Sequence, residues 1–192
     1  MASIEKHLEK KVAEKGVDEA VGGAKAAIKG AFKVATDESH KMVVRLTNKT
    51  NQKWSKPKLY LNNGATDGIL PLTIDKDEEI QYEVHKKKWT YSGIAGVIVY
   101  QWKESEDSYY LAVMFEKPMV ARNMWNAVIF NTSTEANQQL FDKLNDKTSS
   151  YPPMRGDSNY IEREFSHCPY TLQGAMSTTG RMVNITICYK SK

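Results

Sequence analysis

The chain has 192 residues, of which 41% are hydrophobic, and its formal net charge is +4 at pH 7. This length suits one domain, or one domain with an arm, and the hydrophobic fraction is enough for a core. The sequence contains no run of 18 or more apolar residues, which excludes a ready-made membrane-spanning helix. The basic residues are scattered without an arginine-rich tract, so nucleic acid is not an expected partner.

Residues 1–38 form a segment of different composition, without Trp, Tyr or Pro and rich in Ala, Lys and Glu. This composition predicts helix. The segment divides at Gly16 into two helical pieces. The first is very polar, and the second begins at Asp18 and extends to about residue 35. Lysines follow one of its faces, and an apolar stripe follows another, made of Val21, Ala24, Ile28, Ala31 and Phe32. The stripe either packs on the core of the protein or lies on and enters a membrane, and the two states can follow one another.

From Met42 onward the pattern changes to short apolar and β-branched runs separated by turn residues, which predicts strands. These runs are residues 42–46, 58–61, 69–74, 79–84, 93–102, 109–115, 125–130 and 183–190. One helix is predicted at about 134–147, capped by Ser133 or Thr134, with Ala136, Leu140 and Leu144 on one face. The prediction is a mainly β protein. An amphipathic arm spans residues 1–38, and a β-sandwich with one internal helix spans 39–192, so that two helices flank the sandwich.

The sequence offers little catalytic chemistry. It lacks a Gly-x-Ser-x-Gly elbow, a phosphate-binding loop and a His-Glu-x-x-His pair, and its four histidines are far apart. We therefore expect no enzyme, no catalytic residue, no cofactor and no metal site. Cys168 and Cys188 allow one disulfide. The charged N-terminus is unlike a secretory signal, which leaves two compartments open: the cytoplasm, or secretion with a leader missing from this sequence.

Two short motifs have two interpretations each. Trp89 and Tyr91 follow the basic run 85–88, a pattern that suits a membrane interface, although Trp89 can also pack at the start of a strand. Arg155, Gly156 and Asp157 form the triplet that integrins read on exposed loops. The triplet can equally have a local role in its own loop.

Seven segments in the same order resemble the actinoporins, the pore-forming cytolysins of sea anemones. They are KLYLNNGATDGILP (58–71), YSGIAGVIVY (91–100), LAVMFEKP (111–118), WNAVIF (125–130), EANQQLFDKL (135–144), RGD (155–157) and GAMSTTGRMVNITI (174–187). The resemblance covers about Lys41 to Tyr189. It implies a β-sandwich with a helix on each face. It also implies a secreted protein that is a monomer in solution, binds phosphocholine headgroups, preferably of sphingomyelin, and forms homo-oligomeric pores.

The resemblance also assigns roles to residues. The stripe of Val21, Ala24, Ile28 and Phe32 stands where the membrane-inserting helix belongs, and the triplet 155–157 stands where protomers or local loops make contact. The expected lipid-contact residues are Trp89, Tyr91, Pro118, Met119, Met124, Trp125, Phe141 and Asn63. Several family aromatics are replaced in this chain, by Met119, Val120 and Met124 in one loop and by Asn145 and Asp146 near the helix. A choline cation is held by aromatic faces, so the replacements predict an altered headgroup specificity. The alternative is a non-lytic module that binds a lipid, a glycan or a protein on the same fold.

Overall fold

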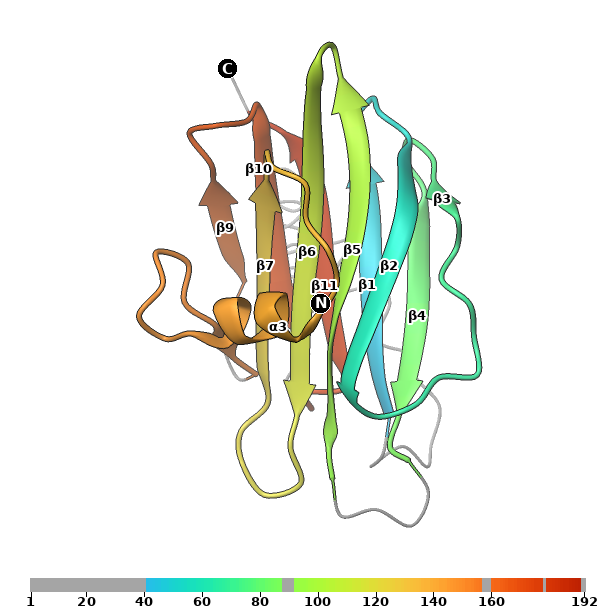
Figure 1. Cartoon of the computed structure of the whole chain (residues 1–192), viewed down its shortest axis with the longest axis vertical. Helices are drawn as coiled ribbons and strands as arrows, with labels where there is room; N and C mark the ends of the chain where they lie inside the picture. Colours follow the sequence, from blue (N-terminus) through green and yellow to red (C-terminus); the bar gives the residue numbers. More distant parts are fainter. Residues whose placement is uncertain (1–40, 88–91, 157–159, 178, 191–192) are drawn as a thin grey trace, which may run out of the picture. The chain divides into compact units, whose positions relative to one another are not determined.

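The computed structural model describes residues 41–87, 92–156, 160–177 and 179–190, which form two β-sheets packed face to face (Figure 1). One sheet has the strand order β4-β1-β11-β10-β9, and the other has the order β3-β2-β5-β6-β7-β8. Neighbouring strands are antiparallel except for β1 and β11, which are parallel. The β-sandwich predicted from the sequence is confirmed.

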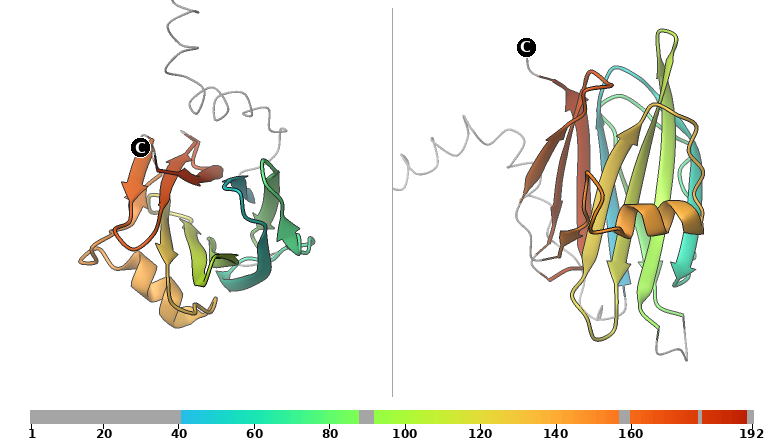
Figure 2. Two further views of the ribbon diagram at one scale, coloured as in Figure 1. Left: turned by 90° about the horizontal axis from the view of Figure 1, so that it is seen from above. Right: turned by 60° about the vertical axis from the view of Figure 1, so that its left-hand side comes forward.

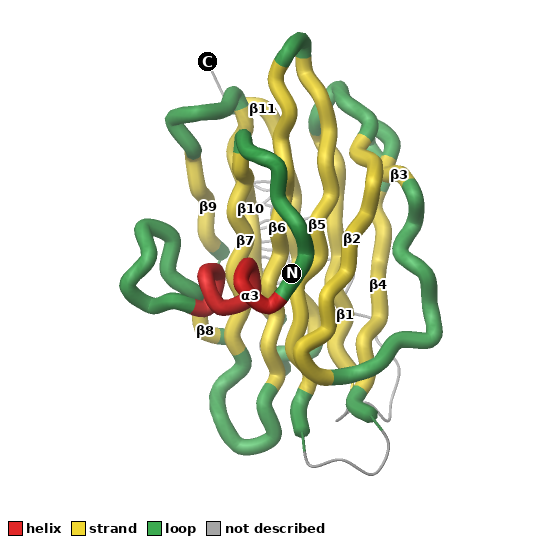
Figure 3. The backbone as a smooth tube through the Cα atoms, viewed as in Figure 1, coloured by secondary structure: helices red, strands yellow, loops and turns green. Residues whose placement is uncertain are grey.

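The elements have the following bounds. The first sheet contains β1 (Lys41–Lys49), β4 (Glu79–His85), β9 (Ile161–Glu164), β10 (Tyr170–Met176) and β11 (Met182–Tyr189). The second contains β2 (Trp54–Asn63), β3 (Thr73–Ile74), β5 (Ile94–Glu104), β6 (Asp107–Lys117), β7 (Met124–Phe130) and β8 (Met154–Arg155). The helix α3 (Gln138–Asn145) lies across the outer face of the second sheet, beside β7 and β6 (Figures 1 and 3).

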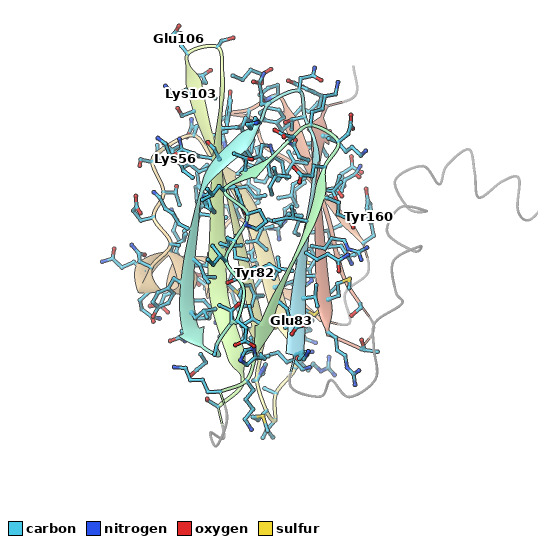
Figure 4. The ribbon with its side chains drawn as sticks, turned by 90° about the vertical axis from the view of Figure 1, so that its right-hand side faces the viewer. Lys56, Tyr82, Glu83, Lys103, Glu106 and Tyr160 are labelled. Carbon is cyan, nitrogen blue, oxygen red and sulfur yellow. The ribbon has the colours of Figure 1, made fainter. Side chains whose placement is uncertain are left out.

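Burial along the strands follows their place in the two layers, which Figure 2 shows from above. β4 alternates, so that Tyr82 points into the core while Glu83 points outward and pairs with Lys41 at 2.9 Å (Figure 4). β5 is instead buried on both sides from Ile94 to Tyr100, because the core covers one face and α3 contacts the other. This double cover explains why the strand is continuously apolar from Ile94 to Tyr100.

Aromatic side chains fill the space between the sheets. The rings of Trp54 and Trp102 stack with their centroids 5.3 Å apart, and the ring of Tyr170, from the other sheet, meets Trp102 edge-on at 5.3 Å. Trp125 is fully buried against Gly174, where an added Cβ would lie 2.5 Å from Cη2 of the indole. Gly174 therefore leaves the space that this ring needs between β7 and β10.

Some predicted boundaries are wrong. The helix is shorter than 134–147, because Asn137 caps it by accepting a hydrogen bond from the backbone N–H of Leu140. Thr134 instead closes a turn with the carbonyl of Thr132, while Leu140 and Leu144 are buried as predicted. In the run 69–74 only Thr73–Ile74 is a strand, and Ile69 is 91% exposed. Strands β8, β9 and β10 were not predicted.

Both cysteines are free, so the disulfide that the sequence allowed is not formed. Each thiol donates to a carbonyl at 3.8 Å, Cys168 to Tyr170 and Cys188 to Thr171. The division at residue 38 and the helix of the arm fall in residues 1–40. They lie outside the described residues and stay predictions.

Candidate functional site

The loop that joins β6 to β7, residues 118–123, lies at one end of the sandwich and exposes apolar side chains (Figure 1). Val120 is 99% exposed and Met119 is 48% exposed. Neither side chain belongs to the core, and adjacent exposed apolar side chains at a loop tip indicate a surface that contacts a lipid or a protein.

A cleft of about 690 Å³ opens beside this loop, and we call it the α3 cleft. Its walls come from the end of β6, the loop 118–123, the C-terminal end of α3 and the segment 147–155 that follows it (Figure 3). The lining residues are Glu116, Pro118, Ala121, Arg122, Met124, Asn145, Lys147, Pro152, Pro153 and Arg155. This volume lies in the range of small-molecule sites.

The α3 cleft is lined by more cationic than anionic side chains. Three cationic side chains line it, Arg122, Lys147 and Arg155, against one carboxylate, Glu116. The Oε2 atom of Glu116 accepts a hydrogen bond of 3.3 Å from Nδ2 of Asn145. The net positive charge favours the binding of an anionic group in the cleft. The carboxylate of Glu116 also gives the cleft one defined acceptor for a hydrogen-bond donor.

A buried hydrogen-bond network fixes the wall formed by α3 and the segment after it. Asn126 of β7 is fully buried, and its Nδ2 donates to the carbonyls of Leu144 at 2.7 Å and Tyr151 at 2.8 Å. Arg163 of β9 donates to Oδ1 of Asn126 at 2.5 Å and to the carbonyl of Pro152 at 2.9 Å. Burial lowers the pKa of the Arg163 guanidinium. Asn126 thus holds the backbone on both sides of the segment 145–150, and Arg163 holds the next residue, Pro152, so the network supports this wall of the cleft.

The triplet at 155–157 is built into the same region. Arg155 is exposed and lines the α3 cleft, whereas Gly156 is buried and its N–H donates to the carbonyl of Asn123 at 2.7 Å. A Cβ at Gly156 would lie 2.7 Å from the sulfur of Met176 and 2.8 Å from Cβ of Asn123. Glycine is thus needed for close approach to the loop 118–123, which is a local role for the motif. Asp157 lies outside the described residues.

The other predicted lipid-contact residues fall in three places. Pro118 and Met124 line the α3 cleft, and Met119 belongs to the exposed loop beside it. Trp125 and Phe141 belong to the core, with 0% and 4% exposure, so neither ring can contact a bilayer in this packing. The expectation for these two is corrected, since β7 and α3 turn their rings inward.

Asn63 is half-buried at the end of β2, opposite Ala95, and is not part of the cleft lining. Trp89, Tyr91 and the stripe of Val21, Ala24, Ile28 and Phe32 lie outside the described residues, and their roles stay predictions.

Sequence reasoning missed part of the cleft. Lys147, Pro152 and Pro153 come from one short segment, and only the fold brings Glu116, about 30 positions earlier, to the same cleft. Asn145 carried a signal, because it replaces an aromatic residue of the resembled family. Across the described ranges no group of three or more His, Cys, Asp or Glu is placed to hold a metal ion. Within those same ranges, no helix has the length and apolar character that crossing a membrane requires.

Three comparisons bear on this site and its fold. A family model described as sea anemone cytotoxic protein matches residues 21–189. Cytolysin tenebrosin-B of Actinia tenebrosa is 26% identical over 184 residues, with 88% of this chain and 83% of the relative covered. DELTA-actitoxin-Aeq1b of Actinia equina is 27% identical over 186 residues, with the same coverages of 88% and 83%. The crystal structure of the lipid binding protein Nakanori superposes with a TM-score of 0.57 at 12% identity, covering 95% of this chain and 85% of that one, which shows a shared fold.

Proposed function

Because the chain belongs to the sea anemone cytotoxic protein family, we propose that it binds the membrane of a target cell, oligomerises there and forms a pore. One observation of the structure carries the membrane contact. The exposed apolar side chains of Met119 and Val120 lie beside a cleft with three cationic residues. This arrangement is typical of a surface that binds at the membrane interface. The apolar side chains enter the interface, and the neighbouring cations contact lipid phosphate.

The proposed route has two stages. The loop 118–123 and the α3 cleft contact the bilayer first, and Trp89 and Tyr91 extend this contact. Protomers then assemble, and the helix of residues 18–35 inserts with its stripe of Val21, Ala24, Ile28 and Phe32 toward lipid. The family match begins at residue 21 and so includes this stripe, which supports the second stage.

The test is dye release from vesicles, with the same vesicles pelleted to measure binding. Ile28→Asp places a charge in the stripe and should abolish release while binding persists, because a charge in the bilayer is costly. Ala26→Asp is the matched control, since two helical positions from Ile28 the same charge falls on the opposite face and should preserve most release. Equal release by Ile28→Asp and the unchanged protein would exclude insertion of this helix.

The outcome for the unchanged protein separates the two function classes. Binding with release supports the pore former. Binding without release from any vesicle composition would support the non-lytic binding module instead.

A further inference from the structure

The α3 cleft differs from a choline site in the chemistry of its walls. A trimethylammonium group has no N–H to donate, and proteins hold it on the faces of aromatic rings. No aromatic residue lines this cleft within the described part of the chain. Two aromatic residues that the sequence analysis expected at the lipid contact, Trp125 and Phe141, have their side chains in the core.

The cleft offers a carboxylate in place of aromatic faces. Glu116 stands near the end of β6, half-buried, and its Oε2 is held by the amide of Asn145 at 3.3 Å. Among the residues that the structure describes, the ion pairs between side chains do not include Glu116. A partly buried carboxylate with one neutral donor can accept further hydrogen bonds from a cation. A primary ammonium, with three N–H groups, supplies them.

The remaining polar wall suits a phosphate. Lys147 follows α3, Arg155 ends β8, and Arg122 belongs to the loop 118–123, so the three cations enter the cleft from three different segments. Arginine and lysine are the residues that bind phosphate oxygens, arginine with a planar fork and lysine as a point charge. A phosphate held by these cations and an ammonium held by Glu116 would use both signs of charge in the cleft.

We propose that the α3 cleft binds a phosphate ester that carries a primary ammonium, and prefers it to a phosphocholine group. The ethanolamine and serine headgroups of membrane lipids share this chemistry. The inference deepens the proposed function, because it names the headgroup class at the surface that contacts the bilayer.

Vesicle pelleting with the full chain tests the preference. Phosphatidylcholine vesicles are compared with vesicles in which part of this lipid is replaced by phosphatidylethanolamine, by phosphatidylserine or by sphingomyelin. Phosphatidylethanolamine is zwitterionic like phosphatidylcholine, so stronger binding to it cannot come from surface charge. We expect binding about tenfold stronger with phosphatidylethanolamine, the size of one charge-assisted hydrogen bond. Measuring the serine arm also in high salt removes non-specific attraction of the basic protein.

Glu116→Gln is the decisive variant, because it keeps the shape and one acceptor oxygen while removing the charge. It should reduce the preference for ethanolamine over choline vesicles to about unity, and the readout is the ratio of binding to the two vesicle types within each variant. Glu106→Gln is the matched control, since Glu106 is exposed at the tip of the β5–β6 hairpin, away from the cleft (Figure 4). Thermal unfolding of both variants shows that the fold is kept. An unchanged preference in Glu116→Gln would overturn the proposal.

Soluble probes separate this inference from the proposed function. Free phosphoethanolamine should shift the amide NMR signals of the full chain at the α3 cleft more strongly than phosphocholine or inorganic phosphate at equal concentration. Such binding without vesicle leakage would support the inference and contradict the pore former. Vesicle leakage together with equal NMR shifts for all three probes would support the pore-forming function and overturn the inference. Equal responses to phosphoethanolamine and inorganic phosphate would reduce the cleft to an anion site and overturn the role of Glu116.

Discussion

Arg163 of β9 donates a hydrogen bond of 2.5 Å to the side-chain oxygen of Asn126 on β7, and this contact joins the two sheets beneath the α3 cleft. Arg163 also donates to the carbonyl of Ala127 at 2.9 Å. Asn126 in turn holds the end of α3 through Leu144. The position of the cleft wall thus depends on the buried amide of Asn126.

Replacing Asn126 by Ala should lower the free energy of unfolding by about 2–4 kcal/mol. The change removes three hydrogen bonds and leaves a guanidinium and two carbonyls without this partner. Chemical denaturation measures the loss. Asn62→Ala is the control, because Asn62 is exposed on β2 and its loss should stay within about 0.5 kcal/mol. Equal stability of the two variants would show that the network does not hold the wall.

Gly156→Ala should destabilise the protein by about 1–3 kcal/mol, because the new methyl group meets Met176 and Asn123 at less than contact distance. Gly68→Ala is the matched control: its Cβ would have ordinary contacts, the nearest at 3.8 Å from Tyr82. Melting temperatures of both variants check the expectation. If Gly156→Ala were as stable as Gly68→Ala, the motif at 155–157 would have no structural role, and the integrin interpretation would gain support.

The strands were the part of the fold that periodicity could predict. β4 alternates and β5 is continuously apolar from Ile94 to Tyr100, and each pattern follows from how many faces the fold covers. The short strands β8 and β9 were missed, because two to four residues of mixed polarity carry no period. The extra helical turn predicted before Gln138 does not form, because Asn137 caps the helix while Thr134 bonds to the carbonyl of Thr132.

The candidate site was only partly predictable, for a different reason. Aromatic residues such as Trp125 suggest a membrane interface by type, but their burial depends on which face of a strand they occupy and on what lies opposite. Gly174 is what admits the Trp125 ring into the core, and it is 49 positions away in the sequence. Glu116 and Lys147 meet at the cleft by the same kind of long-range placement.

Exchanging Met119 and Val120 together for Ser should weaken vesicle binding by tenfold or more without changing stability. Both side chains are classed as exposed and neither belongs to the core, whereas fully burying an exposed side chain of this kind is worth about 1.5–3 kcal/mol. Pelleting assays and thermal unfolding measure the two effects. Trp125→Ala should give the opposite result, a loss of about 3–5 kcal/mol in stability from a buried ring. Unchanged vesicle binding by the double variant would remove the loop 118–123 from the membrane contact.

Alkaline pH should destabilise the protein through buried phenols, and Tyr170 is one of them. Burial, and then its hydrogen bond to Glu104, raise the pKa of Tyr170, and burial also raises that of Tyr189, which donates to the same carboxylate at 2.7 Å. Since the folded pKa lies above the unfolded value of about 10, this contribution is complete below that value and is lost as pH rises toward the folded pKa.

The measurement is the free energy of unfolding in urea between about pH 9 and pH 11. The unchanged protein should lose up to about 1.4 kcal/mol per pH unit for each such phenol above the unfolded pKa, and Tyr170→Phe should lose less per unit. Lysines titrate in the same range, but they are common to both proteins and cancel in the difference. Tyr110→Phe, a phenol outside the Glu104 cluster, controls for the substitution itself. Parallel pH profiles for Tyr170→Phe and the unchanged protein would mean that ionisation of this phenol is not linked to folding.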